Sequence, residues 1–143
     1  MIKEFVERWD KYKGDLEKYF RNTRQEEYSD YEDIVKALFK EVINKEEIDG
    51  YEFDLDKMTI IDDGDYQGTR IFIIPLDTYQ PSVEEYVITN TYYGSCSGCD
   101  TLLAISSYDD GIPNEGQVKD YIELALHLLQ KCRWLEEGAD IDE

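Results

Sequence analysis

The sequence predicts a single α+β domain: an antiparallel sheet of three to four strands, covered by two N-terminal and two C-terminal helices. Three observations predict it: helical periodicity at the start of the chain, β-branched and aromatic runs in its middle, and helical periodicity again near its end. The chain has 143 residues, of which 41% are hydrophobic and 13% aromatic. A chain of this length and apolar content can bury one hydrophobic core, and its composition differs from that of a disordered chain. We therefore expect one two-layer domain spanning residues 1–143.

The N-terminal part, residues 1–47, is predicted to be helical. Apolar residues recur at steps of three and four between Ile2 and Phe20, which places them on one face of a first helix. A second apolar stripe runs from Tyr31 to Ile43. Ser29 and Glu32 have the spacing of a capping box, so we expect the second helix to begin there.

Residues 51–93 are predicted to form the sheet, in runs that read YEFDL, MTIIDD, TRIFIIPL and EEYVITNTYY. The turn-rich residues 62–68 predict a hairpin, and the two prolines of residues 75–82 exclude a central strand there. Ile71 to Ile74 are apolar without alternation. We expect that strand to be central and covered on both faces.

Residues 98–136 are predicted to form the two C-terminal helices. The first is short, and the second runs from about Gln117 to Glu136 with an apolar face that includes Val118, Tyr121 and Cys132. Residues 137–143 form an acidic tail that we expect to be frayed.

The formal charge of the chain is −19, and residues 51–143 carry −15 of it. Such a field repels nucleic acid and anionic membranes and attracts basic proteins, so we expect a basic protein partner and no direct nucleic-acid or membrane binding. No apolar run is long enough for a membrane span, and the N-terminus does not have the pattern of a signal peptide. The sequence therefore predicts a cytoplasmic protein.

A CxxC pair, Cys96 and Cys99, lies in the segment YYGSCSGCD. In order of preference, we interpret the pair as packing and loop geometry, as part of a zinc site with Cys132 and Asp100, or as a thiol redox site. The chain offers few further ligands, so a zinc site shared within a homodimer also stays open. In the first interpretation the loop presents Tyr92, Tyr93 and Asp100, and no cofactor is required.

Acidic residues and tyrosines of the second half are the candidate partner-binding residues. Carboxylates on a rigid scaffold can occupy the positions of DNA phosphates, and tyrosine is favoured at interfaces. The set is Asp54, Asp56, Asp62, Asp63, Asp65, Tyr66, Tyr79, Glu84, Glu85, Tyr92, Tyr93, Asp109 and Asp110.

No enzyme class has motif support. The segment from Asp62 to Asp65 lacks the spacing of a calcium loop, and nucleotide-binding, zinc-protease and serine-hydrolase motifs are missing. The single histidine, His127, has no nucleophile placed with it by a motif.

The runs Gly68–Ile105 and Leu124–Lys131, above all YQPS and YYGSCSGCDTL, resemble a family of small acidic proteins of bacteriophages and prophages of Gram-positive bacteria. The resemblance lends no catalytic residues. It implies a phage accessory protein, a class that includes acidic inhibitors of host defence nucleases. We therefore expect a non-enzymatic, anti-CRISPR-like DNA mimic that occludes a basic site on a host protein. The alternatives are a CxxC metal or redox protein and a virion-assembly protein.

Overall fold

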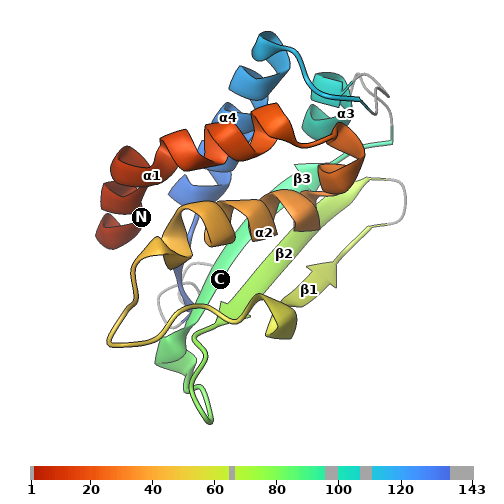
Figure 1. Ribbon diagram of the computed structural model, residues 1–143. Helices are drawn as coiled ribbons and strands as arrows, with labels where there is room; N and C mark the ends of the chain where they lie inside the picture. The colour runs from red at the N-terminus through yellow and green to blue at the C-terminus, as the bar shows by residue number, and fades with distance from the viewer. Residues whose placement is uncertain (1, 65–66, 96–99, 107–110, 136–143) are drawn as a thin grey trace.

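The computed structural model describes residues 2–64, 67–95, 100–106 and 111–135 and confirms the predicted α+β class. Four α-helices and one antiparallel sheet are formed by these residues. The helices α1, α2 and α4 lie together on one face of the sheet, so the fold has two layers (Figure 1). The helices are α1 (Lys3–Asn22), α2 (Tyr31–Glu41), α3 (Thr101–Ser106) and α4 (Glu115–Gln130), and the strands are β1 (Thr59–Asp62), β2 (Gly68–Pro75), β3 (Tyr86–Tyr93) and β4 (Arg133–Trp134).

The second helix begins one residue later than the predicted capping box. Asp30 is the N-cap residue, and its side chain and that of Asp33 form the reciprocal capping box. Ser29 instead ends a short 3₁₀ helix, Gln25–Tyr28, that precedes α2. The predicted pair of Ser29 and Glu32 is therefore wrong, although the start of the helix is predicted to within a residue.

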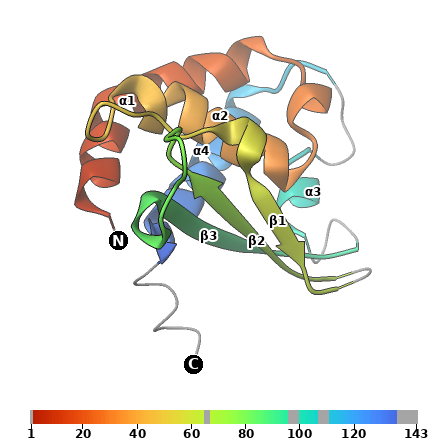
Figure 2. The ribbon, with the colours of Figure 1, turned by 90° about the horizontal axis from the view of Figure 1, so that it is seen from below.

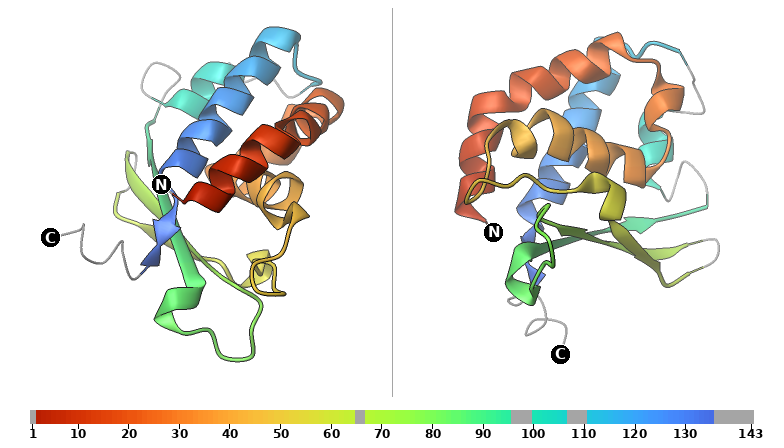
Figure 3. Two further views of the ribbon diagram at one scale, coloured as in Figure 1. Left: turned by 90° about the vertical axis from the view of Figure 1, so that its left-hand side faces the viewer. Right: turned by 60° about the horizontal axis from the view of Figure 1, so that its bottom comes forward.

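The sheet has the strand order β1-β2-β3-β4. The predicted hairpin joins β1 to β2, and the predicted proline-containing connection joins β2 to β3. As predicted, the Ile71–Ile74 strand is central. It is covered on only one face: Phe72 and Ile74 are buried under the helices, whereas Ile71 and Ile73 are partly exposed. None of α1, α2 and α4 lies on that second face (Figure 3).

Two predicted elements are different in the structure. Tyr51–Leu55 is not a strand but contributes an isolated bridge between Phe53 and Leu76, and a 3₁₀ helix, Leu55–Lys57, follows. The last helix ends at Gln130 instead of Glu136, because the chain then pairs with β3 as the short strand β4. Stacking of Trp134 on Phe53, with ring centroids 6.0 Å apart, holds β4 in this place.

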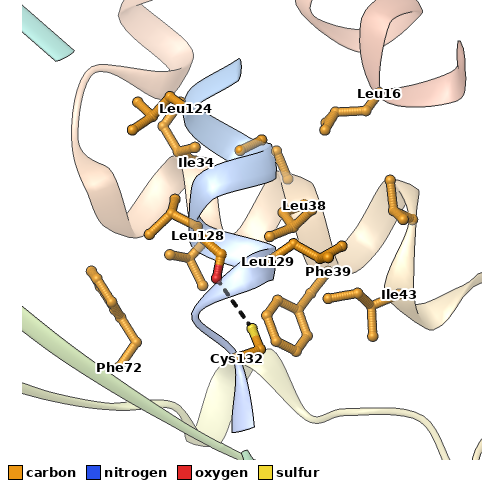
Figure 4. Packing of buried hydrophobic residues seen from close by; sticks show 14 of the residues in the cluster. Leu16, Ile34, Leu38, Phe39, Ile43, Phe72, Leu124, Leu128, Leu129 and Cys132 are labelled. Atoms are coloured by element: carbon orange, nitrogen blue, oxygen red, sulfur yellow. Dashed lines mark hydrogen bonds between the residues drawn. The ribbon is translucent and has the colours of Figure 1, made fainter. Parts of the chain in front are cut away.

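One hydrophobic core joins α1 to α4 with β2 and β3, in agreement with a single domain. Figure 4 shows its centre, where Leu128, Leu129 and Cys132 of the C-terminal part lie against Phe39 of α2. Such burial removes apolar surface from water and is the main favourable contribution to folding. The core also contains Arg8, whose guanidinium donates hydrogen bonds to the carbonyls of Ile43 and Glu47.

Candidate functional site

The predicted contact residues that the structure describes fall into two groups, at opposite ends of the sheet. Together with three neighbouring charged residues that were not predicted, Arg70, Glu52 and Asp77, we call these groups the turn end (Asp62, Asp63, Arg70, Tyr92 and Tyr93) and the loop end (Glu52, Asp54, Asp56, Asp77, Tyr79, Glu84 and Glu85). β2 and β3 have eight residues each, so the two ends are about 25 Å apart. In Figure 1 the loop end lies at the bottom of the view and the turn end at the right. One flat contact surface therefore does not contain the whole predicted set.

At the turn end, Asp62 is engaged within the molecule. Its carboxylate accepts hydrogen bonds from the Tyr93 hydroxyl and the Gly64 N–H, and pairs with Arg70 at 3.3 Å. The hydroxyl of Tyr93, the Gly64 N–H and Arg70 together lower the pKa of Asp62. Arg70 also pairs with Asp30 at 2.6 Å and stacks over the Tyr93 ring. The negative charge of Asp62 is thus compensated before any partner binds.

Asp63 and Tyr93 are held in a similar way. One carboxylate oxygen of Asp63 accepts the N–H of Thr69 at 2.6 Å. Tyr93 is 8% exposed, and its hydroxyl also donates to the Gly64 carbonyl. The structure therefore removes Tyr93 from the exposed contact residues, whereas Tyr92 is exposed as predicted.

Asp100 is buried beside the turn end and does not face a partner as the loop interpretation expects. Its carboxylate accepts hydrogen bonds from the Tyr31 hydroxyl and the Gly94 N–H, both at 2.8 Å, and from the Leu103 N–H at 3.1 Å. The Tyr31 hydroxyl in turn accepts from the Leu102 N–H, and its burial raises the pKa of Tyr31. This network ties α2 to the end of β3 and to α3.

Six predicted site residues lie outside the described residues. They are Asp65, Tyr66, Cys96, Cys99, Asp109 and Asp110. The predictions made for them stay predictions.

The loop end is built by backbone hydrogen bonds between segments that are distant in sequence. The N–H of Asp54 donates to the Pro75 carbonyl, and the N–H of Asp77 donates to the Glu52 carbonyl, each at 2.8 Å. The N–H of Leu76 donates to the Glu85 carbonyl, also at 2.8 Å. These bonds bring together acidic residues from before β1 and from the connection between β2 and β3.

A hollow of about 540 Å³ opens at the loop end. Carboxylates dominate its rim, while Phe53 and Leu55 contribute apolar surface and Lys40 is its one lysine. The lining residues are Lys40, Asn44, Glu52, Phe53, Asp54, Leu55, Asp56 and Asp77. Four acidic side chains, with Lys40 in the lining and Lys57 3.8 Å from Asp54, leave the hollow with a net negative charge, so it favours a cationic group.

The loop-end acids are less engaged than those of the turn end. Asp54 caps the 3₁₀ helix and approaches Lys57 at 3.8 Å, and Glu85 bonds to Ser82. The side chains of the other four, Glu52, Asp56, Asp77 and Glu84, form no hydrogen bond or ion pair with any residue that the structure describes. Tyr79, 95% exposed, lies on the same connection between β2 and β3. The loop end therefore carries negative charge that is available to a partner.

Six residues of the hollow are missing from the predicted set: Lys40, Asn44, Glu52, Phe53, Leu55 and Asp77. Glu52, Asp54 and Asp56 alternate with Tyr51, Phe53 and Leu55 in the sequence, and in an extended segment this spacing places carboxylates on one side. That signal was sufficient to find Glu52. The side-chain amide of Asn44 donates a hydrogen bond to the Phe53 carbonyl and accepts one from the Phe53 N–H. This arrangement depends on the tertiary fold.

Cys132, the third candidate zinc ligand, lies in the core at 0% exposure. Its thiol donates to the Leu128 carbonyl at 3.4 Å, and burial raises its pKa to about 12 (Figure 4). A zinc ligand is a thiolate, so this environment suits packing and opposes coordination. Within the described ranges, no group of three or more His, Cys, Asp or Glu side chains could hold a metal ion.

A second, smaller hollow of about 320 Å³ lies between α3 and α4. Ile105 and Leu124 contribute its apolar lining, with Asp120, Glu123 and His127 along one side of α4. No hydroxyl or thiol nucleophile hydrogen-bonds to His127 among the described residues. The described residues of this hollow therefore show no nucleophile paired with the histidine.

Two searches give negative results. In the described part of the chain, no helix combines the length and the apolar character that crossing a membrane requires. Comparison of the chain with models of known protein families, with curated proteins and with solved structures finds no match.

Proposed function

We propose that this protein is a non-enzymatic binding protein that uses the loop end to engage and occlude a basic site on another protein. The observation that carries the proposal is the hollow at the loop end, lined by Glu52, Asp54, Asp56 and Asp77, of which Glu52, Asp56 and Asp77 form no side-chain hydrogen bond or ion pair with a described residue. An arginine or lysine side chain would be paired there by more than one carboxylate.

The remaining surface of the loop end supports the same function. Glu84 adds charge, and Tyr79 offers an exposed aromatic side chain that can cover a partner surface at low entropic cost. The excess of acids over bases across the chain accelerates encounter with a basic protein and slows encounter with nucleic acid. Both effects become weaker as salt rises.

For the partner, we propose a host nucleic-acid-processing or defence enzyme in the bacterial cytoplasm. A site that binds DNA or RNA is basic because it contacts phosphates, and an acidic protein competes for such a site directly. The resemblance to phage accessory proteins supports this choice of partner.

The test compares two variants of equal charge in partner capture from bacterial lysate. Asp56→Asn with Asp77→Asn removes two charges from the loop end, and Asp62→Asn with Asp63→Asn removes two from the turn end. We expect a basic nucleic-acid enzyme to be retained by the wild type and the turn-end variant, to be lost by the loop-end variant, and to elute as salt rises. Equal retention by both variants would contradict the proposal.

A further inference from the structure

Among the residues that the structure describes, β1 is an edge strand with a free side. The sheet ends at β1, and the side chains of all four of its residues are exposed, including Ile60 at 36% and Ile61 at 47%. Figure 2 shows β1 outside β2, on the margin of the sheet. Proteins commonly protect such edges with proline, lysine or a covering element. The residues Thr59–Asp62 include neither proline nor lysine.

The pairing of β1 with β2 fixes which backbone groups are free. The N–H of Asp63 donates to the Thr69 carbonyl, so this pair is a hydrogen-bonded one. In an antiparallel ladder, hydrogen-bonded and non-hydrogen-bonded pairs alternate. Ile61 therefore bonds toward β2, whereas the N–H and carbonyl groups of Ile60 and Asp62 point to the free edge.

Both faces of the edge are apolar at its centre. Ile60 is opposite Phe72 on the face that the helices cover, and Ile61 is opposite Ile71 on the other face. A strand added beside β1 would place its alternate side chains next to these two isoleucines. β-branched residues fit such positions best.

The charge next to β1 is asymmetric along the strand. The 3₁₀ helix Leu55–Lys57 precedes β1, so Asp56 and the acidic hollow lie at the start of the edge. At the other end of β1, Asp62 is paired with Arg70. The four carboxylates of the hollow therefore lie at the start of the edge together with Lys57, which is 3.8 Å from Asp54, and Asp63 lies at the other end without an ion pair among the described residues.

We propose that β1 accepts an extended segment of the basic partner as an additional antiparallel strand. β-branched residues of that segment lie along Ile60 and Ile61, and arginine or lysine residues follow them and enter the hollow beside Asp56. Main-chain hydrogen bonds to Ile60 and Asp62 supply affinity, and the charged end supplies direction. This inference rests on the proposed function and adds the form of the partner.

A second copy of this chain fits the edge less well than a basic segment. A second copy brings a chain of the same formal charge, −19, to this edge, so the two chains repel one another. A partner with arginines or lysines at one end avoids this repulsion.

The test uses a synthetic peptide that contains alternating threonine and valine residues followed by a glycine and a run of arginines. Two further peptides carry N-methyl groups at alternate residues of the β-branched part. The first lacks the N–H donors on one edge of the extended peptide, and the second lacks those on the opposite edge. We expect the parent peptide to shift the backbone amide resonances of Ile60 and Asp62 and to slow their hydrogen exchange. One of the methylated peptides should then bind about tenfold more weakly than the other, because only one edge pairs with β1.

Equal affinity of the two methylated peptides, whether both bind or neither does, would overturn the inference, as would resonance shifts that spare β1. Concentration-dependent dimerisation of the protein alone, with slowed exchange at Ile60, would assign the edge to a second copy and overturn it as well. A peptide that binds through the hollow without discrimination between the methylated forms would leave the proposed function in place. The two failures are thus distinguishable.

Discussion

The two ends of the sheet are both rich in acids, yet they differ in what those acids do. At the turn end, Asp62 is held by Arg70, Tyr93 and the Gly64 N–H, and the nearby Asp100 is buried in a network with Tyr31. At the loop end, the side chains of Asp56, Asp77 and Glu84 form no hydrogen bond or ion pair with a described residue, and a hollow opens beside the first two of them. The formal charge of the chain therefore overestimates the negative charge that a partner encounters, because some of the carboxylates are bonded within the molecule and stabilise the fold.

The largest loss of stability is expected when the Asp100 network beside the turn end is broken. Asp100→Ala removes a buried acceptor of three hydrogen bonds and leaves the Tyr31 hydroxyl and two N–H groups without it. We expect the free energy of unfolding in urea to fall by about 3 kcal/mol. The matched change at the loop end, Asp77→Ala, should alter it by less than about 0.5 kcal/mol. Similar losses in the two variants would end the distinction between the two ends.

A smaller effect is expected from the exposed part of the turn end. Arg70→Met keeps the aliphatic stem but removes the ion pairs with Asp30 and Asp62 and the contact with the Tyr93 ring. We expect a loss of about 1 to 2 kcal/mol in the free energy of unfolding, since exposed pairs and cation–π contacts each contribute little. Lys40→Met is the control, because Lys40 has no such network. Full stability of Arg70→Met would show that Asp62 is not held by this arginine.

The smallest of the stability effects concerns pH. The hydroxyl of Tyr93, the Gly64 N–H and Arg70 lower the folded-state pKa of Asp62, so its contribution is present above the unfolded pKa of about 3.9 and is lost as pH falls below it. In the Asp62→Asn variant, stability should therefore fall less steeply than in the wild type as the pH is lowered. Asp77→Asn, measured in parallel by thermal unfolding between about pH 2 and pH 5, should leave the slope of the wild type. A flattening by both variants would contradict the assignment.

The sequence predicts the elements better than their contacts. Helical periodicity locates α1 and α2, and β-branched runs locate β2 and β3, because burial of one face imposes a period that one sequence can show. It misses β4, because Arg133 and Trp134 continue the helical pattern of α4 and only their pairing with β3 makes them a strand. Tertiary pairing decides such short elements.

The candidate site is predicted only in part, for a related reason. Asp54, Asp56, Glu84 and Glu85 are identified from charge and lie together as the loop end. Sequence alone does not separate them from Asp62, which has the same composition around it but an arginine across the hairpin. Nor does it reveal that Tyr93 faces the core, because a register shift of one residue would exchange it with Tyr92.

The most direct test of the central claim is the affinity of an oligoarginine peptide for the two double variants of equal charge, measured by calorimetry at low salt. The account predicts that Asp56→Asn with Asp77→Asn weakens binding about tenfold, whereas Asp62→Asn with Asp63→Asn weakens it less than about twofold. Equal weakening would show that only net charge matters and would contradict the claim that the loop end is the binding surface.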